Sequence, residues 1–290
     1  HPARILAARI MSTCRVALHH FIGMCQDHWL WITKGAMTPT EPNTTALRTI
    51  SNLIIAVVLL GSPACPALDY EPLRMLILGD SNIYESFGKE LESDFSAAGY
   101  QVKRRGKPTS GMARPDFFDW LTAGAELVDR HRPDVVLIMF GGNDGQRLEP
   151  FPGSGGTRIK WKHEAAWKAE YTRRIRTLVR ILGGHGARVF LLSPTNRRSQ
   201  KAVEKMQRVI ACQRAAVGDL YFATWVDTWT PSSGIDGRYL RRGSDPAARH
   251  HHWREVRYRK GDGIHLTKAG AVDLREKIAT ELRRFGVIAW

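Results

Sequence analysis

Short apolar runs alternate along the chain with longer segments in which apolar residues recur every three or four positions. The apolar runs end in glycines or polar pairs, and such runs are typical of strands that are buried on both faces of a parallel sheet. The predicted strands lie at residues 74–79 (RMLILG), 101–105 (QVKRR, short and polar), 134–140 (DVVLIMF), 187–192 (ARVFLL) and 221–226 (YFATWV).

The helical spacing is clearest between residues 82 and 97. There Ile83, Phe87, Leu91 and Phe95 fall at four-residue steps, as on the buried stripe of an amphipathic helix. Because strands alternate with helices, the pattern predicts an α/β fold with a parallel sheet between two layers of helices. The remaining predicted helices lie at residues 117–131, 167–182, 200–217 and 267–285, and residues 230–261 are predicted to be a long, basic, irregular loop.

An apolar stretch near the N-terminus, ISNLIIAVVLLG at residues 50–61, has a different character. It is shorter than the roughly 20 residues that a membrane-spanning helix needs. A basic residue precedes it and the small-residue stretch SPACPA follows it, which is the pattern of a secretory signal. We therefore expect residues 37–67 to be an export signal that is cut after Ala64 or Ala67. Residues 68–290 would then form the exported domain, in a bacterial periplasm or outside the cell.

Two other interpretations of this stretch stay open. It could be an uncleaved N-terminal anchor, or Cys65 could carry a lipid, although Ser62 and Pro63 make a poor lipidation signal. Residues 1–36 precede Met37, which opens a segment of normal signal length, and we interpret them as an upstream or non-native extension. Once the signal is cut, no stable membrane span is expected.

The composition is that of a globular protein with a strong excess of basic residues. The chain has 290 residues, 43% of them hydrophobic, and a formal net charge of +15, of which +12 remains without residues 1–67. This charge is compatible with nucleic acid, an anionic membrane or an acidic envelope polymer as a partner, and export disfavours nucleic acid. Removal of the signal also leaves Cys212 as the one cysteine, so neither an intrachain disulfide nor a CxxC metal pair is expected.

Two places in the chain carry residues suited to acyl transfer. The tripeptide GDS at residues 79–81 begins at the last residue of the strand at 74–79, and a predicted helix follows it. Ser81 is therefore expected at the carboxyl edge of the sheet, beside the unpaired backbone N–H groups of a helix N-terminus. Near the C-terminus, Asp262 precedes His265 by three residues, just ahead of the last helix. Acyl transfer needs a nucleophile and a base with an orienting partner, and these three residues match that need.

Four short motifs then resemble the sequence blocks of the SGNH, or GDSL, hydrolase superfamily. They are GDSN at 79–82, SGM at 110–112, GGND at 141–144 and DGIH at 262–265, in the order of that superfamily. The surrounding phrases GMARPDFFDW and GDGIHLTKAG are similar to an exported bacterial subgroup of unknown function. Asn82 stands where GDSL proteins often have Leu, at a position without a chemical role.

The resemblance implies a flavodoxin-like three-layer α/β/α sandwich with a central parallel sheet, and ester hydrolysis without a cofactor. It implies Ser81 as the nucleophile, His265 as the base and Asp262 as its partner. The oxyanion hole would consist of the backbone N–H groups of Ser81 and Gly111 and the side-chain amide of Asn143. Each motif alone could be an ordinary turn, because Gly, Asn and Asp are turn residues. All four in order at predicted strand ends favour the functional interpretation.

Other polar residues near these motifs have weaker signals. Arg114 and Arg147 each follow an oxyanion donor by a few residues and are candidates to bind an anionic group of the substrate, with a surface or ion-pair role as the alternative. Asp80 and Asp144 are expected to hold the site loops by hydrogen bonds rather than to act as acids. Consecutive histidines, as at 250–252, rarely converge on one ion, so no metal site is expected there. Tryptophans that could include a sugar-stacking platform, or pack in the core, are Trp161, Trp167, Trp225, Trp229 and Trp253.

Together these features favour an exported serine esterase that hydrolyses acyl esters, including O-acetyl groups, on a cell-envelope or extracellular polysaccharide. An O-acyltransferase with the same triad is an alternative, because a sugar hydroxyl could replace the attacking water. A non-catalytic protein that binds the envelope through its basic surface is another. No nucleotide-binding motif is present, and the pattern specifies no oligomeric state.

Overall fold

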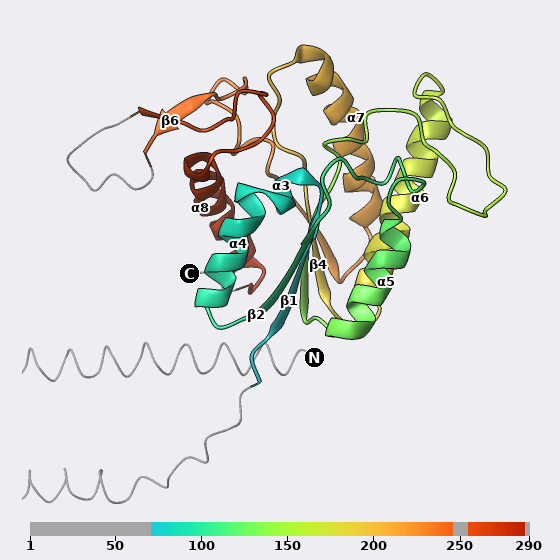
Figure 1. The fold of residues 1–290 in the computed structure, drawn as a ribbon, viewed down its shortest axis with the longest axis horizontal. Helices are drawn as coiled ribbons and strands as arrows, with labels where there is room; N and C mark the ends of the chain where they lie inside the picture. Colours follow the sequence, from blue (N-terminus) through green and yellow to red (C-terminus); the bar gives the residue numbers. More distant parts are fainter. Residues whose placement is uncertain (1–70, 246–254, 288–290) are drawn as a thin grey trace, which may run out of the picture. The chain divides into compact units, whose positions relative to one another are not determined.

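A five-stranded parallel sheet runs through the computed structural model, which describes residues 71–245 and 255–287 (Figure 1). Its strands, in chain order, are β1 (Arg74–Gly79), β2 (Gln101–Gly106), β3 (Val135–Met139), β4 (Arg188–Leu192) and β5 (Ala223–Val226). The strand order β2-β1-β3-β4-β5 is that of flavodoxin-like folds. It leaves β2 at one edge of the sheet and confirms the predicted α/β architecture.

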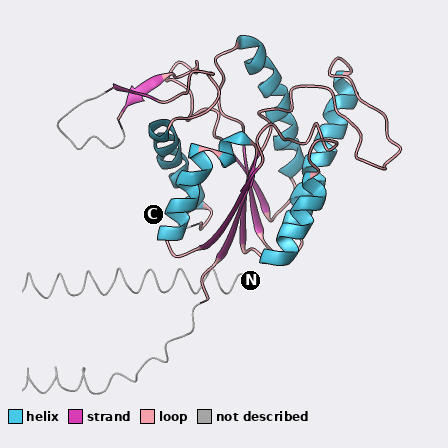
Figure 2. Cartoon of the chain, in the orientation of Figure 1, coloured by secondary structure: helices cyan, strands magenta, loops and turns pink. Residues whose placement is uncertain are grey.

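Helices cover both faces of this sheet (Figure 2). They are α3 (Ser81–Tyr84), α4 (Ser86–Ala97), α5 (Trp120–His131), α6 (Glu164–Gly183), α7 (Gln200–Val217) and α8 (Lys268–Arg284). Along β1, Leu76 and Leu78 lie in one buried cluster with residues of α5, α6 and α7. Met75 and Ile77 lie in a second cluster with residues of α4 and α8. This alternation follows from the two-residue period of a strand and produces the three layers.

The segment predicted as one helix over residues 82–97 is divided in the structure. Ile83, Phe87, Leu91 and Phe95 are all buried, as the spacing predicts, but Glu85 has non-helical backbone angles, with φ −90° and ψ −149°, and separates α3 from α4. A Cβ on Gly88 would overlap the carbonyl of Ile83, so the two helices pack closely because this position has no side chain. Apolar spacing alone does not reveal such a break.

The segment 230–261, predicted to be irregular, contains a small antiparallel sheet of β6 (Arg242–Ser244) and β7 (Glu255–Arg257). The prediction was wrong here because strands of three residues with polar side chains show no apolar period. The Tyr258 hydroxyl stabilises the pair by donating to the carbonyl of Ser244 at 2.6 Å.

Several predictions concern residues outside the described ranges. These are the export signal at 37–67, the extension at 1–36, lipidation of Cys65, the histidines at 250–252 and Trp253. In residues 71–245 and 255–287, no helix combines the length and apolar character that crossing a bilayer requires. Cys212 is buried on α7 with a free thiol.

Candidate active site

Ser81 lies at the carboxyl edge of the sheet, where β1 leads into α3. Gly79 ends the strand, and a Cβ at this position would collide with the carbonyl of Met139 and the side chain of Ile83. Asp80 caps the short helix by accepting a hydrogen bond from the backbone N–H of Asn82 at 2.9 Å. Close packing at Gly79 and the cap at Asp80 therefore fix the turn that presents the Ser81 hydroxyl.

Ser81, His265 and Asp262 form a continuous hydrogen-bonded chain. Nε2 of His265 lies 2.7 Å from Oγ of Ser81, and Nδ1 lies 2.8 Å from Oδ2 of Asp262. A carboxylate only accepts, so Nδ1 carries the proton and Nε2 is free to accept one from the serine. The side chains of His265 and Asp262 are 20% and 42% exposed, which leaves the site open to a substrate.

The Asp262 carboxylate is held in its charged form. Burial by itself would raise its pKa, but hydrogen bonds from the His265 side chain and from the backbone N–H groups of Ile264 and His265 outweigh it and lower the pKa to about 2. The two backbone bonds, at 2.8 Å and 3.0 Å, both go to Oδ1. Asp262 therefore keeps its negative charge beside the imidazole in neutral and mildly acidic solution.

The loop that carries Gly111 is held by hydrogen bonds from the GGND motif and from the first residue of α5. The Asn143 side-chain amide donates to the carbonyl of Ser110 at 2.9 Å, and the Trp120 indole donates to the Ser110 hydroxyl at 2.9 Å. A Cβ on Gly111 would overlap the Asp144 carboxylate. The structure thus brings the predicted oxyanion donors Gly111 and Asn143 into one packed unit at the edge of the sheet.

Asp144 is the buried anchor of this loop. Its carboxylate accepts from the backbone N–H of Ala113 at 2.8 Å and from the Tyr171 hydroxyl at 2.7 Å. Burial raises the pKa of Asp144 to about 6 against these hydrogen bonds. Burial also raises the pKa of Asp80, which the N–H of Asn82 and the charge of Arg197 partly oppose. Both carboxyl groups hold loops, as the sequence predicts.

Two buried arginines at this edge were not predicted. Arg197 is 5% exposed and lies against Gly142 next to the Asp80 carboxylate. Burial lowers its pKa, and the charges of Asp80 and Asp262 act in the opposite direction. Arg259, 1% exposed, donates to the carbonyl of Ile264 at 3.1 Å and thereby supports the loop of His265. Burial lowers the pKa of Arg259 to about 10.

A salt bridge connects the loop that carries His265 with the turn that follows the helix of Ser81. Nζ of Lys260 lies 2.6 Å from Oε2 of Glu85, between the loop of His265 and the turn after α3. The sequence held one usable signal for Arg197, since the segment SPTNRR directly follows β4 at the same edge as Ser81. No comparable signal marks Arg259 or Lys260, which lie in the segment predicted to be irregular.

The other candidate residues have different surroundings. Arg114 forms a bidentate ion pair with Asp116, with two hydrogen bonds of 2.8 Å, and Arg147 forms an ion pair with Glu149. A role for either arginine in substrate binding stays a prediction. Within the described residues, no group of three or more His, Cys, Asp or Glu side chains is arranged to hold a metal ion.

The four described tryptophans among the candidates differ in burial and in the groups that contact their rings. Trp167 is fully buried in the core, and its ring stacks on Tyr171 with a centroid distance of 4.7 Å. Trp161 packs against Trp167 and Trp229 is partly buried beside the same core. Trp225 lies beneath the Arg214 guanidinium, 4.0 Å from its ring centroid. None of the four contacts the triad side chains through an observed hydrogen bond or ring contact.

Comparison with protein families gives one match that covers most of the chain. The family described as "Protein of unknown function (DUF459)" matches residues 74–281, a range that includes all four motifs. A comparison with curated proteins found no significant match.

Solved structures of similar fold include several hydrolases. A GDSL-like lipase from Bacteroides thetaiotaomicron has a TM-score of 0.51 and 17% identity, over 81% of this chain and 98% of that one. A putative acylhydrolase from Bacteroides fragilis has a TM-score of 0.50 and 17% identity, over 86% and 100%. LAE5, an α/β hydrolase enzyme from the metagenome of Lake Arreo in Spain, has a TM-score of 0.50 and 17% identity, over 76% and 99%. At the level of the fold, these matches confirm the resemblance to GDSL hydrolases.

Proposed function

The chain belongs to the family described as "Protein of unknown function (DUF459)", and from that premise we propose that it is a serine esterase that hydrolyses acyl esters through Ser81, His265 and Asp262. The observation that carries the proposal is the chain of two hydrogen bonds, 2.7 Å and 2.8 Å long, that links these three side chains across 184 positions of sequence. Solved hydrolases of the same fold support it, since a GDSL-like lipase and a putative acylhydrolase are among them.

The geometry suggests the following reaction. Oγ of Ser81 attacks the ester carbonyl while Nε2 of His265 takes its proton, and the charge of Asp262 stabilises the imidazolium that forms. The backbone N–H groups of Ser81 and Gly111 and the amide of Asn143 donate to the tetrahedral oxyanion. His265 then protonates the leaving alcohol. Water, deprotonated by His265, hydrolyses the acyl-enzyme and regenerates the Ser81 hydroxyl.

Removal of the nucleophile tests this function. The purified full chain should hydrolyse p-nitrophenyl acetate, and Ser81→Ala should reduce kcat/KM about a thousandfold or more, to the background rate. Ser96→Ala, which truncates an exposed serine of α4, is the matched control and should retain wild-type turnover. Equal turnover by the Ser81→Ala variant and the wild type would refute the proposal.

A serine-reactive phosphonate gives a second readout of the same residue. After incubation with the full chain, mass spectrometry of the digest should locate the adduct on the peptide that contains Ser81. Asp262→Asn should label much more slowly, because its imidazole is wrongly oriented. An adduct on any other serine would argue against the assignment.

For the physiological substrate we propose O-acetyl or similar esters of a cell-envelope or extracellular polysaccharide. The export signal predicted at residues 37–67 and the net charge of +12 that remains without residues 1–67 support this class. Recovered from the envelope of its native host, the protein should begin near Cys65 or Leu68 when its N-terminus is sequenced. Recovery of residues 1–36 intact would contradict the export proposal.

A further inference from the structure

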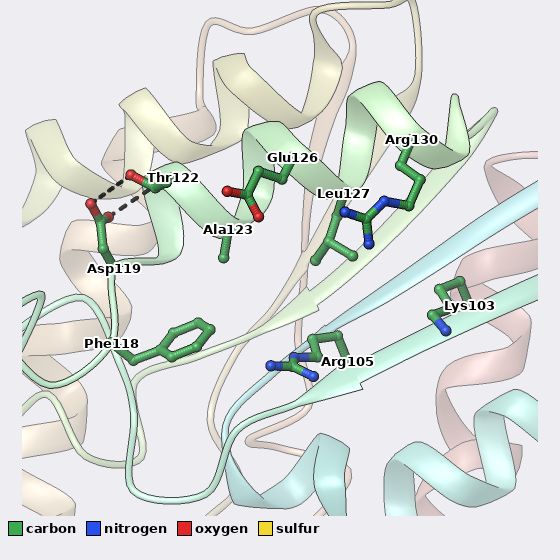
Figure 3. Close-up of a pocket in the computed structure, with 9 residues that line it drawn as sticks. All are labelled: Lys103, Arg105, Phe118, Asp119, Thr122, Ala123, Glu126, Leu127 and Arg130. Atoms are coloured by element: carbon green, nitrogen blue, oxygen red, sulfur yellow. Dashed lines mark hydrogen bonds between the residues drawn. The ribbon is translucent and has the colours of Figure 1, made fainter.

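A hollow separate from the triad lies between the edge strand β2 and helix α5 (Figure 3). We call it the β2–α5 groove. Its volume is about 460 Å³, within the range of roughly 300–1,000 Å³ that is usual for ligand sites. It is lined by Lys103, Arg105, Phe118, Asp119, Thr122, Ala123, Glu126, Leu127 and Arg130.

Three cations face this groove. Lys103 and Arg105 lie on β2, Arg130 lies on α5, and all three line the groove (Figure 3). Several other arginines form ion pairs with carboxylates, namely Arg104, Arg114, Arg147 and Arg174. Among the described residues, no ion pair involves the three cations of the groove. They are therefore available to an external anion.

The two carboxylates of the groove do not balance this charge. Asp119 is committed to the start of α5, where it accepts from the N–H of Leu121 at 2.9 Å. It also accepts from the hydroxyl of Thr122 at 2.8 Å (Figure 3). Glu126 is the second carboxylate and lies on the exposed side of α5. Three cations against one uncommitted carboxylate leave the groove positive.

The effect of these cations reaches a neighbouring residue. The pKa of His131, the last residue of α5, is lowered first by burial and then by the charges of Lys103 and Arg130. A histidine at a helix C-terminus would otherwise be stabilised in its charged form by the helix dipole. The charges of Lys103 and Arg130 thus act on His131 in the same direction as burial.

The groove also has an apolar wall with an aromatic ring. Phe118, Ala123 and Leu127 supply it, and Phe118 packs edge-on against Trp120 with a centroid distance of 4.8 Å. Ligand pockets commonly combine apolar and aromatic walls with a few charged groups that fix the orientation of the ligand. The wall and the three cations together suit an acidic sugar better than a simple inorganic anion.

One loop connects the groove to the candidate active site. Residues 107–119 run from the end of β2 past Gly111 to the start of α5. The Trp120 indole, behind Phe118, donates to Ser110, whose carbonyl also accepts from Asn143. An occupant of the groove therefore contacts the loop that carries Gly111.

We propose that the β2–α5 groove binds carboxylate-bearing sugar units of an acidic polysaccharide, while an acyl ester of the same polymer lies at Ser81. This inference rests on the proposed esterase function and names its substrate class. Basic residues on an edge strand also prevent unwanted strand pairing. That role does not account for Arg130, which lies on a helix, or for Phe118, which lies in a loop.

A binding experiment tests the groove independently of catalysis. Ser81→Ala in the full chain is titrated calorimetrically with hexagalacturonate, an oligosaccharide of carboxylate-bearing sugars, and with the neutral xylohexaose. We expect hexagalacturonate to bind at least about tenfold more tightly. The groove variant, which adds Lys103→Ala, Arg105→Ala and Arg130→Ala, should weaken hexagalacturonate binding about tenfold or more, because it removes three cations that would pair with the sugar carboxylates.

A matched variant separates the groove from the overall charge. Lys89→Ala, Lys162→Ala and Arg180→Ala remove the same charge from exposed positions outside the groove and should change hexagalacturonate binding less than about twofold. An equal loss in both variants, no hexagalacturonate binding, or equal binding of xylohexaose would overturn the inference. Groove-dependent binding to phosphatidylglycerol vesicles without binding of hexagalacturonate would also overturn it.

Kinetics connect the groove to the reaction. In the wild-type background, the ratio of kcat/KM for O-acetylated polygalacturonate to that for p-nitrophenyl acetate should fall about tenfold in the groove variant and stay constant in the matched variant. An unchanged ratio in the groove variant would contradict the inference. If the wild type hydrolyses neither ester, the proposed function fails, while calorimetry on Ser81→Ala still decides whether the groove binds acidic sugars.

Discussion

Two carboxyl groups at the carboxyl edge of the sheet have different surroundings, and their pKa values differ accordingly. Hydrogen bonds from His265 and two backbone N–H groups outweigh burial at Asp262 and lower its pKa to about 2. Burial dominates at Asp144 and raises its pKa to about 6. A charged carboxylate therefore faces the histidine, while the deeply buried carboxyl group holds the oxyanion loop. Residues of one type thus have separate roles that depend on solvation and hydrogen bonding.

Loss of the charge on Asp262 should impair catalysis without preventing folding. Asp262→Asn retains the size of the side chain but no longer favours the histidine tautomer with the proton on Nδ1, so kcat for p-nitrophenyl acetate should fall about 10²–10⁴-fold. Because the wild-type pKa is about 2, Asp262 stays charged between about pH 5 and 9, and a deficit should persist throughout this range. Asp116→Asn, at an exposed carboxylate, is the control. A loss below about threefold would contradict the assigned role.

A methyl group at Gly111 should displace the oxyanion loop. Its Cβ would overlap the Asp144 carboxylate, so Gly111→Ala should lower kcat by about 10²-fold, as expected for a misplaced oxyanion donor. Gly261→Ala is the matched control, because a Cβ there meets no atom within 4 Å. Steady-state kinetics on both variants measure the two kcat values. Equal kcat for Gly111→Ala and Gly261→Ala would exclude a tight contact at Gly111.

At the scale of secondary structure, caps and close glycine contacts decide where elements begin and how they join. Helix α5 begins at Trp120 rather than at residue 117, because Asp119 caps it through the N–H groups of Leu121 and Thr122. Phe117 and Phe118 therefore remain in the loop, where Phe118 forms the wall of the groove. A helix that began three residues earlier would remove that ring from its position.

Loss of this cap should destabilise the fold by a predictable amount. Asp119→Ala should lower the free energy of unfolding by about 1 kcal/mol, the usual effect of an N-cap. Ser199→Ala at the start of α7 is the matched control, because Ser199 makes no capping bond through its side chain, and it should change the free energy by only a few tenths of a kcal/mol. Urea unfolding of the three proteins measures both values. Equal effects would show that the Asp119 bonds are not formed in solution.

At the scale of the whole molecule, the sheet separates two hydrophobic clusters and brings distant segments to one edge. The triad joins residues 184 positions apart, and the Lys260–Glu85 salt bridge joins residues 175 apart. Stability and site geometry are therefore coupled through buried groups such as Asp144, which contacts the Gly111 loop and α6.

The buried Asp144 should make folding stability depend on pH. Its folded pKa of about 6 lies above the ordinary 3.8, so the folded chain favours the protonated form. The resulting stabilisation is fully present below about pH 4 and is lost as the pH rises through 6, by about 2–3 kcal/mol. The difference in unfolding free energy between wild type and Asp144→Asn should therefore decrease by this amount from pH 4 to 7.

Urea unfolding at several pH values measures that difference, and the subtraction removes contributions from other carboxylates. Glu204→Gln, at an exposed position of α7, should differ from the wild type by a constant amount over the same range. A constant difference for Asp144→Asn as well would show that the carboxyl group has no raised pKa in the folded protein.

Much of the architecture was predictable because the controlling signals are local. Apolar runs and helical spacing depend on a few consecutive residues, and α7 spans Gln200–Val217 as predicted. Ser81 and Asn143 each follow the end of a predicted strand, and the carboxyl ends of parallel strands meet at one edge of a sheet. Their proximity to that edge was therefore predictable as well. The short strands β6 and β7 were missed, because three polar residues in extended conformation leave no apolar period.

The sequence by itself determined the α/β order, the burial of the main strands and the motifs that bear the candidate triad, because periodicity and turn chemistry act between neighbouring residues. Only the tertiary structure decided that the His265 imidazole meets Ser81 at 2.7 Å, that Arg197 and Arg259 are buried beside this site, and that β2 and α5 enclose a positive groove. These properties arise when layers pack, since burial and charge proximity depend on residues far apart in the chain.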